Sequence, residues 1–223
     1  MEKKERGAML TDTLEQFFDL FVLNLLFLLC SLPVVTIGAS LTALHRVLLQ
    51  GIRREDAHHA REFFRAFRRE FRQSTLLWLP MLAAAVVLYF DQTVLLPGLD
   101  GAPRVLLFLA SLFFEVLLLL LLVYAFPMQA RYENPVRQTV KNAVLIGIWK
   151  FPQTIAAALC HLALPLVYLL FPAAQPIVMM LYFVCGFSVP LLIADGIVNA
   201  VFVAVIPEER ALQSDGERDE DDG

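Results

Sequence analysis

The sequence predicts an all-α protein, a polytopic transmembrane helical bundle of about six spans with basic amphipathic helices on its cytoplasmic side. First, 58% of the 223 residues are hydrophobic and only 18% are charged, whereas soluble chains are ~45–50% apolar. Second, apolar runs recur near the ~20 residues that a helix needs to cross a ~30 Å hydrocarbon core. Third, the basic residues gather between these runs, as the positive-inside rule requires.

These patterns divide the chain into three parts. We expect residues 1–16 to form a cytoplasmic N-terminal segment, residues 17–206 a single transmembrane helical domain, and residues 207–223 an acidic, disordered cytoplasmic tail. Eight of the 22 acidic residues lie in the last sixteen positions, so the tail accounts for the net charge of −4. Because no small-x-small cleavage site follows the first apolar run, we expect an uncleaved signal anchor.

The first two spans are predicted from the run Asn24–Leu44, which Pro33 and Gly38 interrupt. A single helix over residues 17–50 would be ~50 Å long at ~1.5 Å per residue, too long for one crossing. Pro33 and Gly38 together favour a turn. Basic residues flank the run on both sides, which requires an even number of crossings. The sequence therefore predicts a hairpin of two spans.

The later apolar runs complete the count of six. The candidate spans are Phe17–Leu32, Val34–Ile52, Leu76–Val94, Val105–Phe126, Thr154–Phe171 and Ile177–Ala204. In this arrangement Asp91–Pro103 and Pro172–Pro176 are outer connections, and Arg104 is the only one of 18 Lys and Arg residues that adjoins one of them. The charge distribution therefore favours two cytoplasmic termini.

One alternative topology stays open. Five spans with a re-entrant first segment and an external N-terminus would place Lys3, Lys4 and Arg6 outside, against the positive-inside rule. The point at issue is whether residues 34–52 form a full span, because His45 and Arg46 lie well inside that run.

Two basic amphipathic helices are predicted between spans. In residues 61–73 the phenylalanines and the arginines fall on opposite arcs at ~100° per residue. We expect the phenyl rings to lie in the acyl boundary of the membrane and the guanidinium groups among anionic headgroups, or else to dock a cytoplasmic partner. These arginines are Arg61, Arg65, Arg68, Arg69 and Arg72.

The second basic helix is predicted to start at Asn134 and Pro135, since asparagine caps free N–H groups and proline suits the first turn. Valine or isoleucine recurs at every fourth position from residue 136 to residue 148. Arg137 and Lys141 face elsewhere and are the candidate docking residues of this helix.

Ionisable side chains within spans are costly and are candidates for function. Glu115 lies near the middle of the fourth run, where it should be protonated or find a cation. Arg46, His45 and His161 are its candidate partners in a predicted intramembrane polar cluster. Such a cluster serves either as a structural pair or as a proton or substrate relay. Asp195, Asn199 and Asn24 are expected to form hydrogen bonds between helices.

No motif indicates an enzyme. The sequence contains no metal-ligand spacing, nucleophile elbow or glycine-rich phosphate loop, so we predict no catalytic residues, no cofactor and no metal. Cys30, Cys160 and Cys185 lie in apolar runs and are expected to act as packing residues. The phenylalanine face beside the basic residues favours lipid or protein partners over nucleic acid.

Three blocks of sequence carry a family resemblance: NLLFLLCSLPVVTIGASLTAL, EFFRAFRREFRQSTLLWL and ARYENPVRQTVKNA. Together they resemble the YesL-like family of bacterial integral membrane proteins, a domain of unknown function, from about Phe17 to about Val205. The resemblance implies a multi-pass protein of the bacterial plasma membrane, linked to carbohydrate-uptake systems. It assigns no catalytic or binding residue.

The expected function is therefore that of a non-enzymatic accessory or scaffold component associated with bacterial carbohydrate uptake. Its expected partners are a bilayer with anionic headgroups and subunits of a sugar transporter, and a homo-oligomer stays open. The alternative is a small transporter or channel that uses Glu115, because proline-broken helices often flank a transport site.

Overall fold

The computed structural model describes residues 2–52, 59–132 and 134–206, which form helices and no strand. The helices are α1 (Glu2–Cys30), α2 (Ile37–Ile52), α3 (His59–Phe90), α4 (Gly101–Arg131), α5 (Val136–Trp149), α6 (Phe151–Leu170), α7 (Gln175–Val184) and α8 (Ser188–Val205). Short 3₁₀ turns η1 (Val34–Thr36), η3 (Leu96–Gly98) and η4 (Pro172–Ala174) and a π-helical turn η2 (Asp91–Leu95) lie between them. The predicted acidic tail 207–223 lies outside the described residues.

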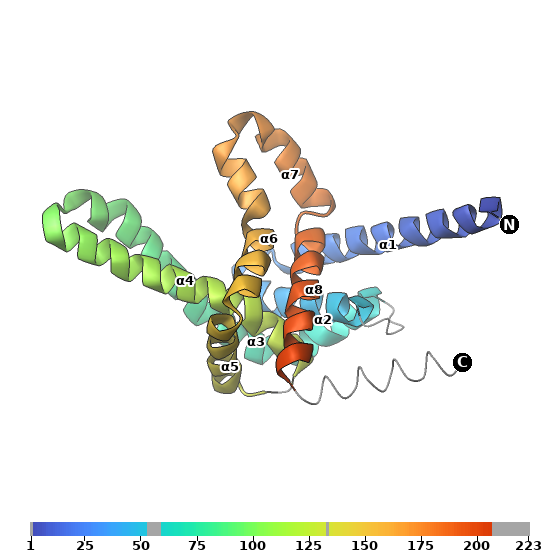
Figure 1. The fold of residues 1–223 in the computed structure, drawn as a ribbon, viewed down its shortest axis with the longest axis horizontal. Coiled ribbons are helices and arrows are strands. Elements are labelled where there is room, and N and C mark those ends of the chain that lie inside the picture. The colour runs from blue at the N-terminus through green and yellow to red at the C-terminus, as the bar shows by residue number, and fades with distance from the viewer. Residues whose placement is uncertain (1, 53–58, 133, 207–223) are drawn as a thin grey trace.

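The helices form a central hub from which three arms project (Figure 1). The hub consists of α2, α8 and the parts of α3, α4 and α6 that pack against them. The arms are α1, the paired α3 and α4, and the hairpin of α6 and α7. Large apolar side chains are exposed along all three arms, which suits a protein whose solvent is lipid.

Helix α2 is the centre of the hub. Its side chains from Gly38 to Leu49 are buried, apart from the partly buried Arg46. Its closest neighbour is α3, and it also packs on α4 and α8. Residues 34–52, whose status as a full span the sequence left in question, are therefore the most buried of the apolar segments. Protein covers the polar side chains of this helix.

Five helical segments of the described chain are long and apolar enough to cross a membrane. They are Val34–Ile52, His59–Gly98, Gly101–Arg131, Phe151–Leu170 and Ser188–Val205. The predicted run 17–32 lies in α1, outside these five, and Pro172–Val184 is a shorter apolar helix. The fold class is confirmed as a helical bundle compatible with a multi-pass membrane protein.

The last predicted span is wrong in one respect, because it is not one continuous helix: the helix is interrupted between α7 and α8 at residues 185–187. Asn24 of α1 lies against this break. Its Nδ2 donates to the carbonyl oxygens of Tyr182 and Phe183, both at 2.9 Å, and its Oδ1 accepts from the N–H groups of Phe187 and Ser188 at 3.0 and 3.3 Å. The Asn24 side chain thus forms hydrogen bonds with backbone groups that the interruption of the helix leaves without helical partners.

The predicted turn at Pro33 and Gly38 is only half correct. Pro33 is extended and precedes η1, and the turn is closed by the Thr36 hydroxyl, which donates to the Pro33 carbonyl at 2.7 Å. Gly38 instead lies inside α2, where an added Cβ would come within 2.5 Å of the Trp78 Cβ and 2.6 Å of the Ser74 carbonyl oxygen. Gly38 therefore permits the close approach of α2 and α3.

The predicted outer loop Asp91–Pro103 is mostly helical, since η2 and η3 continue α3 and α4 starts at Gly101. Gly101 has a φ of +65°, a conformation that suits glycine. The Asp91 side chain is buried and accepts a hydrogen bond from the Ser111 hydroxyl of α4. This contact holds the end of α3 against α4. The predicted turn at 172–176 is confirmed, with η4 between α6 and α7.

Candidate functional site

The strongest candidate site is a buried pair formed by His45 of α2 and Asp195 of α8. The His45 Nδ1 atom lies 2.8 Å from Oδ1 and 2.9 Å from Oδ2 of Asp195, and both side chains have 0% exposure. Both helices are largely apolar, so each polar group depends on the other. The expectation that Asp195 forms a hydrogen bond between helices is confirmed.

His161 of α6 is partly buried. Its Nδ1 is 2.8 Å from the Ala157 carbonyl oxygen one turn earlier. The Nε2 atoms of His45 and His161 are both buried without a hydrogen-bond partner. The described contacts thus join His45 to Asp195, whereas His161 bonds to the backbone of its own helix.

Arg46 takes no part in this pair and instead joins three helices. Its Nε donates to Oε1 of Glu62 at 3.1 Å, and its Nη1 donates to the Ala130 carbonyl oxygen of α4 at 2.9 Å. Glu62 is buried and also forms an ion pair with Arg65 one turn later in α3. The partner of Arg46 is thus a carboxylate from the basic segment of α3.

Glu115 lies away from both groups, in the arm of α3 and α4. It accepts a hydrogen bond from Nε2 of Gln92 at 2.6 Å. The two residues line an open, largely apolar cavity of about 660 Å³ between α3, α4 and α6, together with Trp78 and Tyr89 among others. A carboxylate beside an amide is the polar feature of a cavity whose size suits small ligands.

The four residues of the predicted cluster, Glu115, Arg46, His45 and His161, therefore have separate partners. His45 is paired with Asp195 and His161 with its own backbone, whereas Arg46 binds Glu62 and Glu115 binds Gln92. The sequence shows which polar residues are inside apolar runs, but their pairing depends on which helices pack against α2. The position of Asp195 within an apolar run indicated that it would need a partner. Glu62 could not be identified in this way, because it lies in a charged stretch among arginines.

The basic segment of α3 differs in part from the separate interfacial helix that the sequence predicts. It continues without a break into the apolar part of a 32-residue helix, about 48 Å long at 1.5 Å per residue. Phe63 has 0% exposure and Phe67 also packs against the hydrophobic core, whereas Phe64 is 46% exposed, so part of this face contacts protein. The predicted arginines are all exposed: Arg61, Arg65, Arg68, Arg69 and Arg72.

Two buried glutamates attach this arginine face to the hub. Glu62 does so through Arg46, as described above, and Glu70 is buried two turns later. Glu70 accepts from Nε of Arg69 at 2.6 Å and from Nε2 of Gln129 in α4 at 3.2 Å. Gln129 in turn accepts from the Thr139 hydroxyl of α5 at 3.2 Å. The arginines are therefore presented on a fixed support.

The second basic helix starts one residue later than predicted, since α5 begins at Val136 with Pro135 as its N-cap. The predicted cap by the Asn134 side chain is wrong, because no side chain caps this helix start. Arg137 and Lys141 are exposed. The buried face is rotated from the one expected, because Ile148 is exposed and Thr139, Ala143, Ile146 and Gly147 are buried. Packing against α4 selects this face, with a Leu120 side-chain atom only 2.6 Å from where a Cβ on Gly147 would lie.

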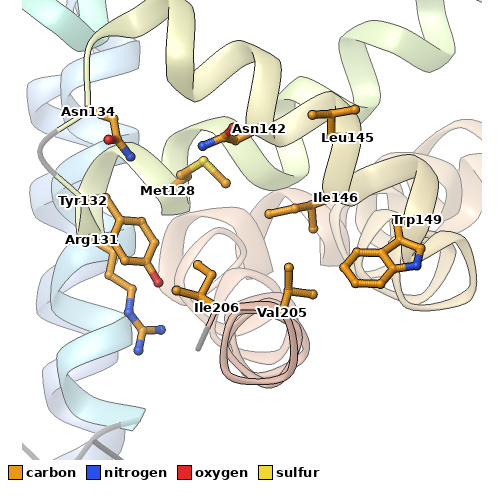
Figure 2. A pocket seen from close by; sticks show the side chains of 10 residues that line it. All are labelled: Met128, Arg131, Tyr132, Asn134, Asn142, Leu145, Ile146, Trp149, Val205 and Ile206. Carbon is orange, nitrogen blue, oxygen red and sulfur yellow. The ribbon is translucent and has the colours of Figure 1, made fainter. Parts of the chain in front are cut away.

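A cleft of about 680 Å³ opens where α4, α5 and α8 end near one another (Figure 2). Arg131 and Tyr132 lie at one side of it and Trp149 at the other, with Ile206 between them (Figure 2). The Arg131 Nη1 donates to Oδ1 of Asn199 at 2.5 Å, which confirms that Asn199 bonds between helices. The sequence had not indicated this cleft.

In the described part of the chain, no three His, Cys, Asp or Glu side chains are placed to hold a metal ion. The three cysteines are free thiols within or beside the apolar helices. What the arrangement offers chemically is a buried imidazole–carboxylate pair at His45 and Asp195, a carboxylate in a largely apolar cavity at Glu115, and an exposed arginine face on α3.

Comparison with known proteins covers part of the chain. A family model described as "Protein of unknown function, DUF624" matches residues 20–92. This segment contains the C-terminal part of α1, all of α2 and all of α3, with His45 and Arg46 but without Asp195 or Glu115. No curated protein and no solved structure matches the chain. Over this segment the chain is thus similar to a family of unknown function.

Proposed function

We propose that this protein is a non-enzymatic accessory or scaffold component that docks a partner through the arginine face of α3. The observation that carries this proposal is that five arginines are exposed on one side of a helix whose other side is fixed in the core by Glu62 and Glu70. Ordering a mobile charged side chain on binding costs ~0.5–1.5 kcal/mol, and a fixed support reduces the additional cost of ordering the backbone.

The resemblance to the YesL-like family supports a more specific role. It suggests a bacterial plasma membrane and subunits of a carbohydrate importer as the partner. The positive-inside pattern supports cytoplasmic placement of the arginine face and of both termini. A partner surface rich in carboxylates would match this face, since arginine binds carboxylates in bidentate geometry.

This proposal is tested by changing the arginines that the internal ion pairs do not use. Arg65 and Arg69 contact Glu62 and Glu70, so their loss would also disturb the fold. We expect the triple variant of Arg61, Arg68 and Arg72 to Gln to reduce recovery of importer subunits in a mild-detergent pulldown by at least ~10-fold, or ~1.4 kcal/mol. Mass spectrometry of the captured subunits measures this.

The matched control is the double variant Arg137→Gln and Lys141→Gln, which removes exposed basic charge from α5 instead. If both variants lose the subunits equally, total charge rather than the α3 face is responsible. Recovery of a protein without importer subunits, from wild type as well as from the variants, would contradict the proposal.

A second candidate function is transport, and the cavity at Glu115 favours it. An acidic group in an apolar cavity between spans is a feature of ion and substrate pathways, and the break between α7 and α8 resembles the discontinuous helices that flank transport sites. In this case Glu115 would bind the cation or the donor group of the substrate.

We expect Glu115→Gln to lower flux by at least ~10-fold in proteoliposomes, because the neutral amide removes the charge that a cation would meet. The measurement uses a pH-sensitive dye inside the vesicles and, separately, a panel of labelled sugars. Glu15→Gln, which changes an exposed carboxylate of α1, is the control. Wild-type vesicles that are no more permeable than protein-free vesicles would rule this candidate out.

A further inference from the structure

The cavity between α3, α4 and α6, here called the α3–α4 groove, is long and narrow. Its lining residues on α3 and η2 recur every three or four positions from Trp78 to Gln92, a length of ~21 Å at ~1.5 Å per residue. Helix α4 returns beside them and contributes residues from Leu112 to Leu122. A volume of about 660 Å³ over this length suits a linear ligand rather than a globular one.

The polar groups of the groove lie toward one end. Gln92 and Glu115 are joined there by the hydrogen bond of 2.6 Å. At the other end, the indole Nε1 of Trp78 already donates to the Val34 carbonyl oxygen at 2.9 Å. Apolar side chains such as Leu119 line the length between them. The groove is therefore amphipathic along its length.

The polar end offers acceptors and a negative charge but no cation. An ionised carboxylate can only accept, so the Gln92 amide nitrogen faces Glu115 and the amide oxygen is left over. In the described chain neither this oxygen nor Oε2 of Glu115 has a hydrogen-bond partner. The salt-bridge contacts of the described residues use other carboxylates: Asp19, Glu62, Glu70 and Asp195.

We propose that the α3–α4 groove binds a single-chain hydrophobic amine, with its ammonium group at Glu115 and Gln92 and its hydrocarbon chain along the groove toward Trp78. An ammonium group brings a positive charge and three hydrogen-bond donors, which are what the two acceptors lack. Charge complementarity counts most in apolar surroundings, where a carboxylate is costly without a cation beside it. The hydrocarbon chain covers the apolar walls.

The groove is open along its side, which gives such a ligand a way in. Tyr89 and Val116 line it and are 72% and 47% exposed, so a molecule dissolved in the surrounding lipid can enter between the helices. A divalent cation is a poorer occupant, because it needs about six oxygen ligands. An ordinary lipid chain would fill the apolar length without using the charge of Glu115.

Quenching of Trp78 fluorescence tests this proposal on the full chain in phosphatidylcholine nanodiscs. The chain has two tryptophans, and Trp149→Phe leaves Trp78 as the reporter at the chain end of the groove. The probe is hexadecylamine with a bromine at the end of its chain, which quenches tryptophan on contact. The same brominated chain with a hydroxyl head is the neutral comparison. We expect the amine to reach half-maximal quenching at a mole fraction at least ~10-fold lower than the alcohol.

Two variants in this background place the ammonium group. Glu115→Gln should abolish the preference for the amine, because it removes the charge and keeps the shape. Asp100→Asn is the control, since Asp100 is an exposed carboxylate at the tip of the same arm and makes no capping hydrogen bond; it should keep the preference. Equal quenching by the amine and the alcohol in the parent protein would overturn the proposal even if Glu115→Gln failed to fold. So would a preference that survives Glu115→Gln.

The proposal deepens the transport candidate, because it names the ligand of the same cavity. Quenching measures binding at equilibrium, so the two ideas fail separately. Selective binding of the amine without any flux would contradict transport alone. Flux that depends on Glu115, without a preference for the amine over the alcohol, would contradict the proposed ligand alone.

Discussion

Asp195→Ala is expected to lower the free energy of unfolding by ~3–5 kcal/mol, because it leaves His45 buried without its partner. Both side chains have 0% exposure, and His45 has no other hydrogen bond through its Nε2. For a chain of this size such a loss lowers the midpoint of thermal unfolding by ~10 °C. Thermal unfolding of the purified protein in detergent, followed by circular dichroism, measures this shift.

The matched control removes both partners. With His45→Leu and Asp195→Leu combined, the buried charges are gone and apolar groups of similar size remain, which is often neutral or stabilising. We therefore expect the double variant to unfold well above Asp195→Ala. If the midpoint of thermal unfolding of Asp195→Ala lies within a degree or two of that of wild type, the pair does not stabilise the hub.

Gly38→Ala is expected to destabilise the contact between α2 and α3 by ~1–3 kcal/mol, the usual cost of overpacking. The new Cβ would lie 2.6 Å from the backbone oxygen of Ser74 and 2.5 Å from the Trp78 Cβ. Neither atom can move without shifting its helix. The shift should weaken the hydrogen bond from the Trp78 indole to the Val34 carbonyl, now 2.9 Å long. Tryptophan fluorescence during denaturation measures both effects.

Gly51→Ala is the control, because Gly51 also lies in α2 but an added Cβ meets nothing within 4 Å. Alanine is the better helix former by ~0.8–1 kcal/mol, so this variant should be neutral or slightly stabilised. Equal destabilisation of both variants would show that the helix itself, rather than its contact with α3, is sensitive to the substitution.

Local signals account for what could be predicted from the sequence. The helix start at Val136 follows from the adjacent proline, and the arginine row of α3 follows from its periodicity. The break between α7 and α8 was missed even though Gly186 and Pro190 lie near it. Glycine and proline are frequent in transmembrane helices, so they do not by themselves identify a break. The backbone at this break is instead stabilised by hydrogen bonds from Asn24, near the other end of the chain.

The amino-acid sequence by itself determined that the helices of this protein suit a lipid environment, and it determined most of the secondary structure. Apolar runs of this length form helices in lipid whatever their neighbours are. Only the tertiary structure decided the pairing of its polar groups. His45 and Asp195 are 150 residues apart, and Glu62 pairs with Arg46 of another helix as well as with its own neighbour Arg65. The physical reason is that a buried charge pairs with the polar group that helix packing brings within hydrogen-bond distance. In this protein the helices that pack around α2 determine which group that is.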